Sequence, residues 1–405
     1  MKKTLLLSVA ASAMLMAGGD IAPVVQEEAP AASEFLIFNN IYAKGEIRPR
    51  YEYVDVDSNG KGEADAYTNR LTLGIGADFM QVDGLSVYLE GTNVMGSGDF
   101  FSTNNNKVNY ETVVDPDQTR ITQAYMDYKF SDTLIRVGRQ GVNLDNQRFI
   151  GTVNWRQMPQ TYDAAAIINN SIDNLSLMAA YVWRVNQVST NDFDTNTVLL
   201  HAAYTFMPEL TLTAYDYIVE NFADTYGIAA TGKVAVGGAN VTYRAEYAHE
   251  KDPSNGTGKA DADYYNLQAT ANMSGFLVGA QYEVLGAGDN NGNGAFYTPL
   301  ATLHAHNGWA DIFLGGTPLN GLVDVNGMVG YKAEGFGVAK VIYHDFSSDK
   351  GSTDYGTEWD ALYKNKIPGV KGLTGMLKAS WYNADQYKKD TTKFWVMLDY
   401  KFSTK

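Results

Sequence analysis

The chain has 405 residues, a formal net charge of −15 and no cysteine, which excludes disulfides and thiolate metal sites. The acidic balance also argues against nucleic acid as a partner. Its 27 Tyr, 17 Phe and 39 Gly are unusually many for a soluble enzyme. No apolar run after residue 19 approaches the 18 or so residues that a membrane-spanning helix needs.

The N-terminus is typical of an exported protein. Lys2 and Lys3 precede the apolar run TLLLSVAASAMLMA, which ends in small residues. This layout predicts a cleaved signal peptide over residues 1–19. Residues 20–40 are rich in Pro and Ala and are expected to form a flexible N-terminal segment. The folded domain is then expected to cover residues 41–405.

Polar and apolar residues alternate from residue 46 to the C-terminus. In NRLTLGIGADF, for example, Arg70 and Thr72 alternate with Leu71, Leu73 and Ile75. Because successive side chains of a strand point to opposite faces, each such segment has one polar and one apolar face. The pattern predicts about eighteen strands, at 46–53, 67–79, 85–93, 121–130, 135–142, 164–169, 176–185, 197–206, 210–218, 226–235, 240–250, 263–272, 276–284, 323–332, 337–346, 357–364, 375–382 and 393–402.

The predicted connections differ in length in a regular way. They are mostly short after even-numbered strands and usually long after odd-numbered ones, as at 94–120, 143–163, 251–262 and 285–322. This predicts an all-β transmembrane antiparallel up-and-down barrel with short periplasmic turns and long extracellular loops. The first and last strands must pair to close such a barrel. A soluble β-sandwich is the alternative, but it gives no reason to sort loop lengths by end. The expected location is the outer membrane of a Gram-negative bacterium, in contact with its lipids.

The sequence contains few candidate catalytic residues. There is no G-x-S-x-G motif, and the five histidines have no evident serine partner, so we expect no enzyme and no organic cofactor. Asp55, Asp57 and Asn59 fit the start of a D-x-D-x-N-G calcium loop, but Ala66 stands where the motif requires a bidentate glutamate. Calcium is thus one interpretation of these residues, and an ordinary polar loop tip is the other.

The arginines are distributed unevenly. All ten lie at or before Arg244, and the chain beyond it contains fourteen lysines and no arginine. Strand periodicity places Arg48, Arg50, Arg70, Arg136, Arg184 and Arg244 on the lumen face. Guanidinium binds carboxylates bidentately, so an arginine-lined wall suits an anionic solute. Acids such as Glu46, Glu52 and Asp127 share this face, so the arginines could equally form cross-strand ion pairs that hold the sheet together.

Two segments resemble a known family. VGRQGVNLDNQRFIGTVNWRQMPQTYDA (137–164) and FYTPLATLHAHNGWADIFLGGTPLNGLVDV (296–325) are similar to segments of alginate-export-type outer-membrane barrels and their porin-like relatives. The resemblance implies eighteen strands around a conduit for an acidic polysaccharide, with Arg136, Arg139, Arg148 and Arg156 at a constriction. The 143–163 loop would fold inward to form it, or its polar residues would only anchor the loop to the wall.

Together these features predict a channel that passes hydrophilic solutes passively, since no nucleotide-binding motif is present. The arginine wall favours anionic oligosaccharides among those solutes. A general or cation-preferring porin is the first alternative. A barrel plugged by the 285–322 loop, serving as an adhesin or structural anchor, is the second. The oligomeric state is left open by the sequence.

Overall fold

The computed structural model describes residues 37–288 and 294–405. The predicted signal peptide and most of the predicted flexible segment lie outside the described residues. The barrel unit extends from Phe38 to Lys405, so it begins slightly before the predicted residue 41. No helix in the part of the chain that the structure describes has the length and apolarity to span a membrane.

Eighteen strands form a single sheet. They are β1 (Phe38–Val56), β2 (Ala64–Phe79), β3 (Leu85–Asp99), β4 (Gln118–Phe130), β5 (Thr133–Gln140), β6 (Thr161–Ile172), β7 (Leu175–Asn186), β8 (Phe193–Met207), β9 (Leu210–Val219), β10 (Ala223–Val236), β11 (Ala239–Lys251), β12 (Asp261–Met273), β13 (Phe276–Leu285), β14 (Leu322–Ala333), β15 (Gly337–Ser347), β16 (Asp354–Lys366), β17 (Leu373–Ala384) and β18 (Thr391–Ser403). Each of these overlaps one predicted strand, and most are a few residues longer.

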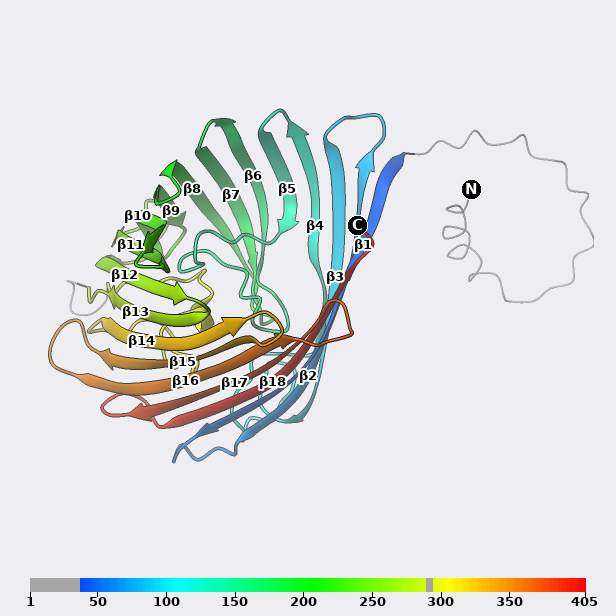
Figure 1. The fold of residues 1–405 in the computed structure, drawn as a ribbon. Coiled ribbons are helices and arrows are strands. Elements are labelled where there is room, and N and C mark those ends of the chain that lie inside the picture. The colour runs from blue at the N-terminus through cyan, green and yellow to red at the C-terminus, as the bar shows by residue number, and fades with distance from the viewer. Residues whose placement is uncertain (1–36, 289–293) are drawn as a thin grey trace, which may run out of the picture. The chain divides into compact units, whose positions relative to one another are not determined.

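The sheet closes on itself, which confirms the predicted barrel (Figure 1). Every strand pairs antiparallel with its sequence neighbours, and β1 also pairs with β18, with Ile47 opposite Tyr400. The chain beyond Phe402 continues this pairing, because the Thr404 amide donates to the carbonyl of Ala43 (3.0 Å). Closure leaves no unpaired sheet edge for the bilayer to meet.

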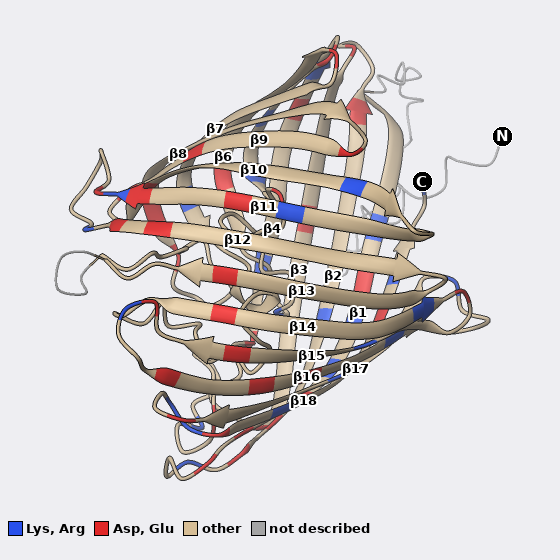
Figure 2. Cartoon of the chain, turned by 60° about the vertical axis from the view of Figure 1, so that its left-hand side comes forward, with Lys and Arg blue, Asp and Glu red and all other residues tan. Residues whose placement is uncertain are grey.

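The period-2 pattern sorts side chains between the two faces as expected. On β2, Arg70 and Thr72 are buried, whereas Leu73 and Ile75 are more than half exposed on the outer wall. Such exposed apolar residues recur around the barrel and form the surface that lipid would cover. Figure 2 shows the charged residues as isolated positions along otherwise uncharged strands.

Connection lengths alternate as predicted. The connections after even-numbered strands are tight, as at 131–132, 237–238 and 274–275, while the long ones, 100–117, 141–160 and 286–321, all follow odd-numbered strands. Ser274 and Gly275 both have positive φ, as a two-residue hairpin turn requires. We call the two rims the turn end and the loop end; the periplasmic and extracellular assignment of these ends stays a prediction.

Two of the long loops fold into the barrel. We call residues 141–160 the β5–β6 loop and the described residues 286–288 and 294–321 the β13–β14 loop. They bind each other inside the lumen: the Gly151 amide donates to the Leu300 carbonyl (2.9 Å), and the Thr302 amide donates to the Gln147 carbonyl (3.0 Å). Phe296 and Leu300 are buried in the main apolar cluster. The lumen is therefore partly filled by the chain itself, as Figure 1 shows.

Candidate functional site: the lumen and its loops

Arg48 on β1 binds the inward β5–β6 loop. Its guanidinium donates to the Gln157 side chain (3.0 Å) and to the carbonyls of Asn154 (2.9 Å) and Arg156 (2.6 Å). Arg50, two residues further along, donates to the Trp155 carbonyl (2.6 Å) and pairs with Glu52 and Asp115. The planar guanidinium group has several N–H donors, so one arginine can hydrogen-bond several carbonyls of the loop at once. These two predicted pore residues thus hold the loop against the wall.

Arg156 joins the two loops to the wall. It pairs with Glu52 of β1 (3.1 Å) and with Asp311 of the β13–β14 loop (3.3 Å). Burial would lower the pKa of Arg156, but the nearby charges of Glu52 and Asp311 raise it above its usual value. Asp311 also pairs with His304 (2.6 Å) and Lys393 (2.8 Å). Burial would raise the pKa of Asp311, yet its contact with His304 and the positive charges of Lys393 and Arg156 hold that pKa well below its usual range.

Arg148 and Arg244 are also occupied by acids. Arg148 is buried and pairs with Glu283 of β13 (3.0 Å). Arg244 makes a bidentate contact with Glu246 on its own strand (2.7 and 2.6 Å). Arg136 faces the lumen near the turn end, where it binds Asp127 bidentately (2.6 and 2.7 Å) and lies over the Tyr125 ring. The ion-pair interpretation of the arginines is therefore supported at each of these positions.

Arg139 and Arg184 lie on the outer face, which corrects their predicted place in the lumen. Tyr162 faces inward, because its hydroxyl donates to the Gly151 carbonyl of the inward loop (2.8 Å). The adjacent Asp163 therefore faces outward, directly opposite Arg139 on β5 and Arg184 on β7. The periodicity that placed Arg184 inside is broken by an irregularity between Val182 and Arg184, and a bulge there shifts every following side chain to the other face. Arg139 came only from the family resemblance, and its own strand periodicity points outward.

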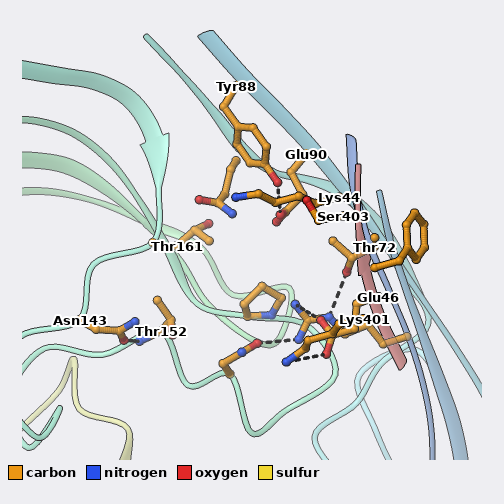
Figure 3. Close-up of a pocket in the computed structure, with 17 residues that line it drawn as sticks. Lys44, Glu46, Thr72, Tyr88, Glu90, Asn143, Thr152, Thr161, Lys401 and Ser403 are labelled. Atoms are coloured by element: carbon orange, nitrogen blue, oxygen red, sulfur yellow. Dashed lines mark hydrogen bonds and ion pairs between the residues drawn. The ribbon is translucent and has the colours of Figure 1, made fainter. Parts of the chain in front are cut away.

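A cavity of about 610 Å³ remains between the β5–β6 loop and the wall of β1–β4 and β18. Asn143, Thr152 and Asn154 line it from the loop. Its wall carries the polar side chains Lys44, Glu46, Arg70, Thr72, Tyr88, Glu90, Gln123 and Lys401. Figure 3 shows Asn143 and Thr152 on one side of this cavity and Lys44, Glu46 and Lys401 on the other. We call it the turn-side cavity, because Lys44 and Lys401 lie near the turn end of β1 and β18.

The turn-side cavity holds one lysine without an acidic partner, whereas its other lysine, Lys401, pairs with Asp399 (3.1 Å). Glu46 lies within ion-pair distance of both Arg70 (3.4 Å) and Lys401 (3.7 Å). Glu90 accepts hydrogen bonds from Tyr88 (2.9 Å) and Thr122 (2.8 Å). Lys44 is exposed in the cavity and has no acidic partner within 4 Å among the described residues; its ammonium lies near the Tyr42 (5.2 Å) and Tyr88 (5.8 Å) rings. Lys44 therefore gives the cavity a free positive charge beside aromatic rings.

Sequence reasoning missed Lys44 and Lys401. Both share strand parity with lumen-facing residues, Lys44 with Glu46 and Lys401 with Asp399. The predicted first strand began at residue 46, so Lys44 fell outside it, whereas β1 begins at Phe38. The predicted pore residues were also all arginines, so no lysine was among them. Longer predicted strands and a count of all cations by parity would have found both.

The predicted calcium loop holds an ordinary turn in this structure. The Asn59 side-chain oxygen accepts from the Lys61 amide (2.9 Å), and its NH₂ group donates to Glu111 (2.5 Å). Within the described ranges no group of three or more His, Cys, Asp or Glu side chains gathers in a way that could hold a metal. Calcium binding by Asp55, Asp57 and Asn59 stays a prediction.

Comparison with known proteins agrees with this architecture. The model of the family described as alginate export matches residues 44–213, which confirms the predicted family resemblance and includes its first segment, 137–164. No curated protein sequence matches the chain.

Among solved structures, OccK8 (OprE) of Pseudomonas aeruginosa is 16% identical with a TM-score of 0.70, covering 91% of this chain and 100% of its own. OccK1 (OpdK) of the same organism is 14% identical with a TM-score of 0.72, covering 90% and 99%. OccAB1 of Acinetobacter baumannii is 12% identical with a TM-score of 0.73, covering 91% and 98%. At these identities the likeness establishes the fold. The chain therefore has the eighteen-stranded barrel fold of outer-membrane porins, and its residues 44–213 match the alginate-export family.

Proposed function

We propose that the protein is a passive outer-membrane channel for small hydrophilic anions, carboxylates above all. The observation that carries this proposal is Lys44 in the turn-side cavity, which has no acidic partner within 4 Å among the described residues, whereas Arg70 and Lys401 are paired with Glu46 and Asp399. A carboxylate entering this cavity would meet the unpaired Lys44 ammonium together with the hydrogen-bonding groups of Gln123 and Asn143. The adjacent Tyr42 and Tyr88 rings would suit a solute that also carries an apolar part.

Small solutes fit this lumen better than the anionic oligosaccharides expected from the sequence. Arg48, Arg50, Arg148 and Arg156 are all engaged with loop or wall groups, so they do not form a continuous free basic wall. The two inward loops also restrict the open space. One structural neighbour, OpdK of Pseudomonas aeruginosa, was crystallised with vanillate, a small aromatic carboxylate. A ligand of that class supports the proposal.

Two alternatives have a specific observation in their favour. Most charges around the turn-side cavity are paired, as Arg70 is with Glu46 and Lys401 with Asp399, which suits a general porin with little charge preference. The extensive bonding between the two inward loops, with Ile150 bridging to Leu300, suits a barrel whose loops close the lumen and whose role is structural.

Single-channel recording in planar bilayers under a salt gradient tests the proposal. Wild-type protein should conduct, prefer anions, and be blocked by benzoate. Lys44→Gln should weaken both the anion preference and the block, while Lys61→Gln, at an exposed lysine in the loop between β1 and β2 at the opposite end of the barrel, should change neither. Equal behaviour of the two variants would leave a general porin. No conductance from correctly folded protein would support the closed structural barrel and refute the channel.

A further inference from the structure

A buried lysine inside the barrel is surrounded by tryptophans. Lys378 of β17 is 6% exposed. Its Nζ lies 4.2 Å from the ring centre of Trp155, 3.8 Å from that of Trp309 and 5.3 Å from that of Trp395. Faces of indole rings attract cations through their quadrupole, most strongly where water is excluded. These rings therefore form an aromatic cage around the Lys378 Nζ.

The walls of this cage come from three separate parts of the chain. Trp155 belongs to the β5–β6 loop, Trp309 to the β13–β14 loop, and Trp395 to β18, where it lies directly opposite Lys378. Trp309 is itself fixed by its amide, which donates to Asp360 of β16 (3.2 Å). The single ammonium of Lys378 thus contacts both inward loops and the barrel wall at one point.

His304 completes the enclosure. Its ring stacks on Trp155 at 4.3 Å between ring centres, with 10° between the planes. Lys378 Nζ lies 2.6 Å from His304 Nε2, and His304 Nδ1 lies 2.6 Å from Asp311. Since Lys378 donates to Nε2, Nδ1 carries the proton given to Asp311. The neutral imidazole of His304 therefore links Lys378 to Asp311, the loop carboxylate that Arg156 and Lys393 also contact.

We propose that Lys378 is an intramolecular ligand of this cage, and that its side chain, as an ammonium ion, holds the two inward loops against the barrel wall. We call this contact the latch. A cage of three indoles and an imidazole is the kind of site that binds alkylammonium ions, and here the chain supplies that ion itself. The latch positions the β5–β6 loop that lines the turn-side cavity. It concerns how the loops are held, so it does not depend on which solute the channel passes.

The test removes the Lys378 side chain beyond Cβ by mutation and then adds a small molecule of the same structure. Lys378→Ala deletes three methylenes and the ammonium, which together match propylammonium. In the variant, hydrogen exchange of loop amides at 141–160 should accelerate on the order of tenfold or more, because one desolvated cation–π contact is worth roughly that factor. Propylammonium should restore protection, whereas propan-1-ol, of the same shape but uncharged, should not.

Lys378→Met tests charge separately from packing, since it keeps most of the side-chain volume. Its loop exchange should resemble that of Lys378→Ala, and the control Lys364→Met, at an exposed lysine on β16, should match wild type. Heat-modifiable migration in detergent gels confirms that each barrel is folded. Wild-type exchange in Lys378→Met, or rescue by propan-1-ol as effective as rescue by propylammonium, would overturn the proposal. Exchange is measured without any current, so failure of the latch and failure of the channel function are distinguishable.

Discussion

Replacing Arg156 by alanine should release the β5–β6 loop from the wall. The side chain pairs with Glu52 and Asp311, whose carboxylates are 0% and 2% exposed. Removing one partner of a buried ion pair leaves an uncompensated buried charge, at a cost of about 3–5 kcal/mol. Here Glu52 keeps Arg50 (3.1 Å) and Asp311 keeps Lys393 (2.8 Å). We therefore expect the lower end, about 3 kcal/mol, or roughly a 150-fold shift toward the open loop.

Hydrogen exchange of the 141–160 peptides, followed by mass spectrometry in lipid nanodiscs, measures that shift directly. Arg139→Ala is the matched control: its pair with Asp163 is partly exposed, at 26% and 15%, lies on the outer face, and is worth about 0–1 kcal/mol. It should leave loop exchange unchanged. Equal exchange in the two variants, or a change below about threefold in Arg156→Ala, would refute the assignment of Arg156 as the ionic link between loop and wall.

Two further predictions concern the same loops. Burial lowers the pKa of His304 from 6.5 to about 3, so a released loop binds a proton that the docked loop does not. Docking of the loop is therefore fully favoured above pH 6.5 and weakens as the pH falls toward 3. Hydrogen exchange of the loop amides, corrected for the intrinsic exchange rate, should rise between pH 6.5 and 4.5. The rise should be smaller in His304→Gln. Tyr162→Phe removes the hydrogen bond to the Gly151 carbonyl (2.8 Å) and should cost about 1–2 kcal/mol of loop docking. Exchange at residues 147–153 checks this, and protection equal to wild type would mean that the hydroxyl does not hold the loop.

The sequence by itself determined the barrel, because strand periodicity is a local signal. Each of the eighteen strands was visible as an alternation over a few residues, and the alternating loop lengths gave the up-and-down order. The same local rule placed Arg48, Arg50, Arg70 and Arg136 inside. It failed at Arg184, where an irregularity in pairing with β8 changes the face, since a bulge arises from the register between two strands and has no signature in one.

The contents of the lumen were decided by tertiary structure. The bonds that fill it join residues far apart in the chain, such as Arg48 with Gln157, Arg156 with Asp311, and Trp155 with Lys378. Composition showed only that four of the ten arginines lie within residues 136–157. Whether those arginines would face a solute or bind the chain's own carbonyls and carboxylates depended on loops that fold inward. Barrel closure brings both loops and the opposite wall within contact distance. These contacts join residues that are far apart in the chain, so no short stretch of sequence predicts them.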